Sequence, residues 1–400
     1  MARCGTATAR DGERIVRVSL FDTLPDRRAS GCIKWTRYAE DVLPMWVADM
    51  DFPVAQPIMD AIQARLAHPV LGYGVNQTGL KARIVDWLAE QYGWRVAPDA
   101  IIAMPGVVPG FNLALRAACK PGAGVVVQTP VYPPMLAAPG HWDMRRIEAS
   151  LTEAGEPDLD ALRAALAEAG AGGAFLLCNP HNPTGRVFRR AELAAMAEAC
   201  IAANATIIAD EIHCDLLFDG RRHIPVASLS PEAAARTITL MSAGKTWNIA
   251  GLNACWAVVP NAALRDRFSR AIASVADHVN ILGLIATEAA LSAGEPWRQK
   301  ALTYLQANRD WLVAAVAERL PGVTMRVPEG TFLAWLDCRA SRAMPDPQRF
   351  FLEEARVGLK PGGDFGGPGH GFVRLNFGCP RATLEEGIDR MARALTRNQG

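Results

Sequence analysis

Three short clusters of polar residues each follow an apolar run that we expect to form a strand. They are Asn179-Pro180-His181-Asn182-Pro183-Thr184-Gly185, Asp210-Glu211-Ile212-His213 and Ser242-Ala243-Gly244-Lys245-Thr246-Trp247. In open α/β sheets, ligands bind beyond the carboxyl ends of the strands. We therefore expect the three clusters to converge on one site that contains an amine, a carboxylate, an imidazole and hydroxyl groups.

This set of groups suits pyridoxal 5′-phosphate (PLP), a cofactor that forms a Schiff base with a lysine amine. Lys245 is the candidate for this lysine and for the base that moves the α-proton of a substrate. The hydroxyls of Ser242 and Thr246 lie beside it in the sequence and could hold the phosphate. Asp210 could pair with the pyridine nitrogen and keep it protonated, so that the ring accepts electrons.

Four further side chains would complete such a site. Asn182 and His213 could donate to the phenolic oxygen of the ring, and Tyr132 could stack on the ring face. Arg374 could hold a substrate carboxylate with its two-pronged guanidinium group. Each residue alone has an ordinary explanation, such as a helix cap for the aspartate or a surface ion pair for the arginine. The hypothesis therefore depends on the whole set and its order.

The pattern of apolar residues predicts an α/β domain followed by a smaller α+β domain. Strands are expected at 125–128, 174–178, 206–209 and 237–241, with helices at 159–169 and 191–203 between them, which favours a mostly parallel sheet. A strand at 254–259 follows so soon that it should be antiparallel to its neighbour. Beyond residue 290 we expect a long helix at 297–319, strands at 324–327, 332–337 and 371–377, and a helix at 348–356. The expected division is an N-terminal arm at 1–55, a large domain at 56–290 and a small domain at 291–400.

Composition excludes several classes of function. The chain has 400 residues and a net charge of +1 from 42 basic and 41 acidic residues, which gives no electrostatic footprint for nucleic acid or an anionic membrane. Its nine cysteines form no Cys-x-x-Cys pair, so we expect no structural metal site and small buried thiols in a reducing compartment. There is no apolar signal core and no apolar run of the roughly 18 residues that span a bilayer. A cytoplasmic location is therefore expected.

The order Asn182, Asp210, Lys245, Arg374 resembles the cofactor and carboxylate set of the fold-type-I, PLP-dependent aminotransferase superfamily of classes I and II. Finer features resemble its MalY/PatB-like cystathionine β-lyase branch. These are the segment Leu43-Pro44-Met45-Trp46-Val47-Ala48-Asp49-Met50-Asp51-Phe52-Pro53, the internal His181 of the first cluster, and His213 where most aminotransferases have Tyr. The resemblance covers nearly the whole chain, from about residue 21 to residue 393.

The resemblance implies the aspartate aminotransferase-like fold, with a mostly parallel central sheet flanked by helices and a smaller α+β domain. It implies PLP as cofactor and Trp46 and Ala48 among the substrate-binding residues. The turn at Gly106, Val107 and Val108 would cradle the phosphate with backbone N–H groups at the start of a helix expected near residue 110. Tyr73, in Leu71-Gly72-Tyr73-Gly74, would reach the phosphate of a neighbouring subunit, which implies a homodimer with shared sites.

Three departures from the branch stand out. Gly244 precedes the lysine where the branch usually has Ser or Pro, and Asn253 stands where many aminotransferases have a phosphate-binding Arg. The segment 27–35 differs from the usual pattern. If that segment lines the entrance of the site, the natural substrate need not be cystathionine.

Three functions remain in competition at this point. The first is a carbon–sulfur β-lyase that acts on cystathionine or another cysteine S-conjugate and releases a thiol, pyruvate and ammonia. The second is an aminotransferase, because the same residues serve both reactions. The third is a PLP-fold protein with a regulatory binding role, against which the intact set of Lys245, Asp210 and Arg374 argues.

Overall fold

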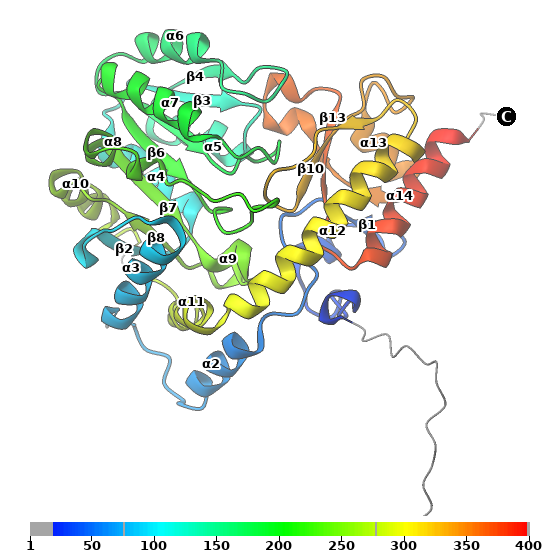
Figure 1. The fold of residues 1–400 in the computed structure, drawn as a ribbon, viewed down its shortest axis with the longest axis horizontal. Helices are drawn as coiled ribbons and strands as arrows, with labels where there is room; N and C mark the ends of the chain where they lie inside the picture. Colours follow the sequence, from blue (N-terminus) through cyan, green and yellow to red (C-terminus); the bar gives the residue numbers. More distant parts are fainter. Residues whose placement is uncertain (1–18, 75–76, 277, 398–400) are drawn as a thin grey trace, which may run out of the picture.

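The computed structural model describes residues 19–74, 77–276 and 278–397 and contains a central seven-stranded sheet (Figure 1). The strand order is β2-β8-β7-β6-β5-β3-β4. β7, β6, β5, β3 and β4 are parallel to one another, whereas β8 is antiparallel to both β7 and β2. The strands are β2 (Ile101–Met104), β3 (Gly124–Thr129), β4 (Arg145–Ser150), β5 (Ala174–Cys178), β6 (Thr206–Asp210), β7 (Thr237–Met241) and β8 (Cys255–Val258).

Helices cover both faces of this sheet, and this accounts for its composition. All five residues of β5 and all five of β7 are buried, as expected for strands of a parallel sheet that is covered on both sides. On one face, α4 (Val107–Ala118) packs against β6 and β7, and α10 (Ala262–Ile272) packs on α4. On the other, α6 (Leu159–Ala169), α7 (Arg190–Ala202) and α8 (Pro231–Arg236) pack against β3, β5 and β6. The α/β architecture expected from the sequence is confirmed.

A second layer of structure is built from the C-terminal and N-terminal parts of the chain. Its four-stranded antiparallel sheet has the order β12-β13-β10-β9. The N-terminal β1 (Leu43–Pro44) pairs in parallel with β11 (Val357–Gly358), so residues before α2 belong to this layer. The remaining strands are β9 (Thr324–Met325), β10 (Leu333–Asp337), β12 (Lys360–Pro361) and β13 (Phe372–Asn376).

The long helix α12 (Glu295–Arg319) joins the two layers. It contacts α11 at its start and α14 and β9 further along, and in Figure 1 it runs from beside α11 toward α13. The other helices are α1 (Ile33–Thr36), α2 (Gln56–Leu66), α3 (Thr78–Tyr92), α5 (Pro133–Ala137), α9 (Ala243–Thr246), α11 (Ile281–Ala293), α13 (Pro347–Glu353) and α14 (Arg381–Thr396). None of the helices in the described ranges is long and apolar enough to cross a membrane.

The expected elements differ from the structure mainly at their ends. β5, β7 and α6 have the expected bounds, and β8 is antiparallel to β7 as expected. The helix expected near residue 110 begins at Val107, because Gly106 with φ +122° already provides the turn that precedes it. The strand expected at 324–327 contains only two residues, Thr324 and Met325.

The start of β3 requires a glycine, which gives a stability prediction. A Cβ atom on Gly124 would lie 2.3 Å from Ala169 Cα at the end of α6, whereas a Cβ on the exposed Gly140 would meet nothing within 4 Å. Because the clash involves backbone, we expect Gly124→Ala to lower the melting temperature by at least about 3 °C. Gly140→Ala is the matched control and should stay within about 1 °C of the wild type. Equal melting temperatures for the two variants would contradict this account of the packing.

Candidate active site

A cavity of about 570 Å³ opens at the carboxyl end of the parallel strands. It is lined by residues that follow β2, β3, β5, β6 and β7 and by residues 253 and 254 just before β8, which runs in the opposite direction. The C-terminal sheet adds Lys360 and Arg374, and the segment before α2 adds Trp46, Val47 and Ala48. The three polar clusters of the sequence therefore do converge on one site.

Most of the residues singled out in the sequence line this cavity. Two of them do not: Thr246 lies buried next to Lys245, and Tyr73 lies elsewhere on the surface with 79% of its area exposed. The residues that line it are Trp46, Ala48, Gly106, Val107, Val108, Tyr132, Asn182, Asp210, His213, Ser242, Lys245 and Arg374.

Asp210 is a buried carboxylate at the end of β6. It is 4% exposed, and its Oδ1 accepts a hydrogen bond of 3.1 Å from the backbone N–H of Ile212. Burial raises the pKa of Asp210 to about 6, although the Ile212 hydrogen bond and the positive charge of Lys245 oppose this rise. A cationic group that entered the cavity beside Asp210 would lower this pKa further, and a protonated pyridine ring is such a group.

Lys245 lies in the short helix α9, which follows β7. Its Nζ donates a hydrogen bond of 2.5 Å to the backbone oxygen of Ala48. Burial and the neighbouring Arg374 lower the pKa of Lys245 to about 8, while Asp49 and Asp210 act in the opposite direction. A lysine with this pKa is partly neutral near pH 7, as a nucleophile or a general base must be.

Buried polar atoms without a partner lie around the same cavity. Neither His213 Nδ1 nor Thr246 Oγ1 has a hydrogen-bond partner, although both are buried. Burial lowers the pKa of His213 well below its usual value, so this ring is neutral and one nitrogen can donate to a ligand. Unpaired buried polar groups are costly, and a polar ligand would satisfy them.

Ser242 differs from Thr246 in this respect. Its hydroxyl donates to the backbone oxygen of Ala254 at 2.7 Å and accepts from the backbone N–H of Gly244 at 2.9 Å, as the cap of α9. A serine hydroxyl has one hydrogen, and here it is engaged. A role for Ser242 in holding phosphate therefore remains a prediction that this geometry does not favour.

The first turn of α4 is the best-placed anion site in the cavity. Val107 and Val108 line the cavity, and amide N–H groups in the first turn of a helix have no partner within the helix. They would stabilise a phosphate together with the partial positive charge of the helix end. Asn253, which also lines the cavity, supplies no positive charge.

Arg374 joins the two layers across the cavity. Its Nη1 donates to Asn182 Oδ1 at 2.8 Å and its Nη2 to the backbone oxygen of Trp46 at 2.9 Å, while its Nε is buried without a partner. Burial lowers the pKa of Arg374 to about 10, so it is still a cation at neutral pH. A substrate carboxylate can accept two hydrogen bonds from Arg374, one from the free Nε–H and one from an Nη–H.

Sequence reasoning missed some lining residues. Lys360 stands beside Arg374 in the ladder between β12 and β13, and its Nζ also contacts the Asp364 carboxylate. Cys178, Ile212, Pro133 and Pro134 line the cavity too. No motif marks Lys360, and only the strand pairing, which the sequence did not predict, places it at the site.

Comparison with known proteins identifies the family. The model of the family "Aminotransferase class I and II" matches residues 40–391. The chain belongs to this family. It is 36% identical to the cystathionine beta-lyase PatB of Bacillus subtilis (strain 168) over 386 residues, which covers 94% of this chain and all of that protein.

Solved structures agree with this assignment. The structure of the PLP-bound C–S lyase from Staphylococcus hominis superposes with a TM-score of 0.89 at 30% identity, and covers 95% of this chain and 100% of that chain. The structure of OvoB superposes with a TM-score of 0.89 at 43% identity, and covers 94% and 99%. The resemblance to the MalY/PatB-like branch and the expected fold are thus confirmed.

The position of Lys245 gives a direct prediction. We expect Lys245→Ala to purify without visible absorbance from bound PLP, because the alanine has no amine to form the covalent link. Lys360→Ala is the matched control, since it removes another lysine that lines the cavity and should keep the colour. Borohydride reduction and peptide mapping of the wild type should place the cofactor on Lys245. Recovery of the reduced cofactor on any other lysine would refute the assignment.

Proposed function

We propose that the protein is a PLP-dependent carbon–sulfur β-lyase that acts on cystathionine or another cysteine S-conjugate. The observation that carries the proposal is the cavity in which Lys245, Asp210 and Arg374 meet, in a chain similar throughout its length to a cystathionine beta-lyase and to a PLP-bound C–S lyase. The reaction takes up water and yields a thiol, pyruvate and ammonia.

The cavity offers a partner for each part of the cofactor. Asp210 would hold a proton on the pyridine nitrogen, with Tyr132 against the ring face. Asn182 and His213 would donate to the phenolic oxygen. The phosphate would bind at the first turn of α4, where Val107 and Val108 line the cavity. When bound there, PLP supplies an electron-accepting ring that stabilises negative charge at the α-carbon of an amino acid.

The residues of the chain then divide the remaining work. Lys245 removes the proton from the α-carbon, for which its lowered pKa is suited. Arg374 binds the substrate carboxylate and so orients the bonds of the α-carbon. Trp46, whose ring lies under the guanidinium of Arg37 with 4.6 Å between the guanidinium carbon and the ring centroid, borders the space left for the sulfur substituent.

The test is a keto-acid-free assay. We expect wild-type protein with PLP and L-cystathionine, or an S-alkyl-cysteine, to release pyruvate and thiol in equal amounts. Lys245→Ala treated in the same way is the control for non-enzymatic release. Turnover that requires an added keto acid would instead identify an aminotransferase. Absence of turnover with tightly bound PLP would favour a binding role, and either result would contradict the proposal.

We also propose a homodimer in which Tyr73 serves the site of the second copy. Tyr73 is 79% exposed and does not line the cavity of its own chain, and its ring lies against that of His278, with 4.4 Å between ring centroids. Exposed apolar residues precede it in the sequence, namely Leu66, Val70 and Leu71. Exposed apolar residues that form a patch are typical of protein interfaces. The phosphate carries nearly two negative charges, and Asn253 contributes none to balance them.

Subunit mixing checks this proposal. Tyr73→Phe and Lys245→Ala subunits should each be impaired alone. One site of a heterodimer takes its lysine from the first chain and its tyrosine from the second, so mixed subunits should regain about one working site per dimer. The control is each variant unfolded and refolded by itself. A monomer in light scattering, or mixed subunits no more active than the separate variants, would end the shared-site claim.

Two further proposals concern organisation and location. The division at residues 55 and 290 is supported by the separate sheets, with the N-terminal β1 attached to β11 of the C-terminal part. A cytoplasmic location is supported by the eight cysteines within the described residues, all of which are free thiols, as in a reducing compartment.

A further inference from the structure

Residues 46–52, which we call the strap, run past the cavity with their backbone oxygens held by side chains. Five consecutive carbonyl groups, from residue 46 to residue 50, accept such hydrogen bonds. The donors are Arg374 to Trp46 O (2.9 Å), Asn376 to Val47 O (2.5 Å), Lys245 to Ala48 O (2.5 Å), Lys34 and Asn376 to Asp49 O (3.1 and 2.6 Å), and Arg27 and Asn248 to Met50 O (2.7 and 2.9 Å). The strap thus contacts both Lys245 and Arg374.

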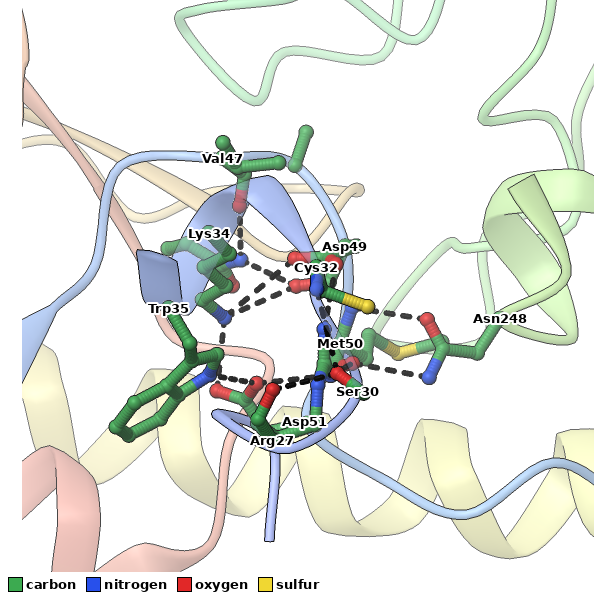
Figure 2. Close-up of polar contacts among 12 residues, drawn as sticks. Arg27, Ser30, Cys32, Lys34, Trp35, Val47, Asp49, Met50, Asp51 and Asn248 are labelled. Carbon is green, nitrogen blue, oxygen red and sulfur yellow. Dashed lines mark hydrogen bonds and ion pairs between the residues drawn. The ribbon is translucent and has the colours of Figure 1, made fainter. Parts of the chain in front are cut away.

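A cluster of four charged residues, Arg27, Lys34, Asp49 and Asp51, holds the strap in place (Figure 2). Lys34 and Asp51 form an ion pair of 2.7 Å, and each side chain is 1% exposed. Arg27 bridges Asp51 at 3.0 Å and Asp49 at 2.7 Å. Trp35 Nε1 donates a further hydrogen bond of 2.9 Å to Asp51. Charges buried in this way are tolerated only when they are paired and hydrogen-bonded, so the cluster fixes the strap in one place.

Asp49 is the member of the cluster that is incompletely satisfied. Its Oδ2 accepts from Arg27, but its Oδ1 is buried without a hydrogen-bond partner and lies 3.7 Å from Lys34 Nζ. Asp49 directly follows Ala48, whose carbonyl accepts from Lys245. A carboxylate that lacks one hydrogen-bond partner is therefore anchored next to the peptide group that holds the lysine.

We propose that Asp49, held in place by Arg27 and Lys34, is a positioning residue: it fixes the strap so that Ala48 O stays against the free Lys245 amine, and its negative charge adds to the effect of that carbonyl. Together with Ala48 O it stabilises the ammonium form, which is the form of Lys245 after the proton has moved from the substrate α-carbon to Nζ. The inference rests on the role of Lys245 proposed above and adds a residue to which the sequence analysis assigned no role.

The other charged groups around Lys245 do not replace Asp49. Asp210 also favours the ammonium form, but a bound pyridinium would compensate its charge. Arg374 on β13 disfavours the ammonium form, and His213 after β6 is neutral. Three more titratable groups line the cavity: Tyr132 after β3, Cys178 at the end of β5 and Lys360 on β12, which is paired with Asp364. Asp49 therefore remains the carboxylate that acts on Lys245 when the cofactor is in place.

The experiment measures the amine itself rather than turnover. Full-length protein is freed of PLP, its fold is checked by circular dichroism, and recovery of visible absorbance on readdition of PLP confirms that the site is intact. Lys245 is then labelled with a limiting amount of an acylating reagent between pH 6 and 10, and the labelled peptide is quantified by mass spectrometry. The midpoint of this profile reports the pKa of Lys245, because only the neutral amine reacts.

We expect Asp49→Asn to move this midpoint downward by roughly half a pH unit or more, because loss of the negative charge destabilises the ammonium form. Asp49→Ser, which removes the same charge with a smaller side chain, should give the same shift if Asn disturbs the fold. Asp49→Glu keeps the charge and should move the midpoint back toward the wild type. Asp41→Asn is the matched control, since Asp41 pairs with Arg356 on the surface with its side chain 62% exposed.

The inference would be overturned if the labelling midpoint of Lys245 in Asp49→Asn and Asp49→Ser equals that in Asp41→Asn. This outcome is independent of the proposed reaction. If the wild type releases pyruvate but the midpoint is unchanged in the Asp49 variants, the role of Asp49 is refuted and the lyase function is not. A shifted midpoint in a protein that releases no pyruvate would refute the lyase function alone.

Discussion

A carboxylate buried at the end of an apolar strand is the constraint on which the site depends. Asp210 ends β6 with 4% of its surface exposed, and burial raises its pKa to about 6. Because this pKa lies above the value of about 3.9 for an unfolded chain, the ligand-free protein loses stability as the pH rises from about 4 to about 6. A protonated pyridine ring beside Asp210 would remove this cost, so the contact that tunes the cofactor also stabilises the fold.

The sheet explains why the other groups lie around Asp210. Five strands place their carboxyl ends at one edge, so the first turn of α4, Tyr132, Asn182 and Lys245 arrive at the same cavity from distant parts of the sequence. Arg374 closes the cavity from the second layer by donating to both Asn182 and Trp46 O. One of these hydrogen bonds, from Arg374 to Asn182, crosses between the two layers inside the site, and the free Nε–H of Arg374 is left for the substrate.

The sequence predicted what local patterns determine. β5 and α6 were predicted with the bounds that the structure has, because β5 is an unbroken apolar run, and Asp158 caps α6 before Gly170 ends it. Asp210 and Lys245 could be found because they follow such strands. Three features could not be predicted from the sequence. They are the hydrogen bond from the Ser242 hydroxyl to Ala254 O, the position of Lys360 beside Arg374, and the charged cluster around Asp51. Each of these depends on pairing between segments distant in the chain, which no local pattern encodes.

The pairing of Asp210 with the cofactor is tested most directly by Asp210→Asn. This change keeps the shape of the side chain and removes the charge that holds a proton on the pyridine nitrogen. Bound cofactor is measured by absorbance and turnover by pyruvate release, on protein whose fold is checked by circular dichroism. We expect the variant to fold and to bind PLP, but to lose roughly a hundredfold or more in turnover, as when a preorganised charge is removed from an active site. Near-normal turnover with bound PLP would contradict the central role of this carboxylate.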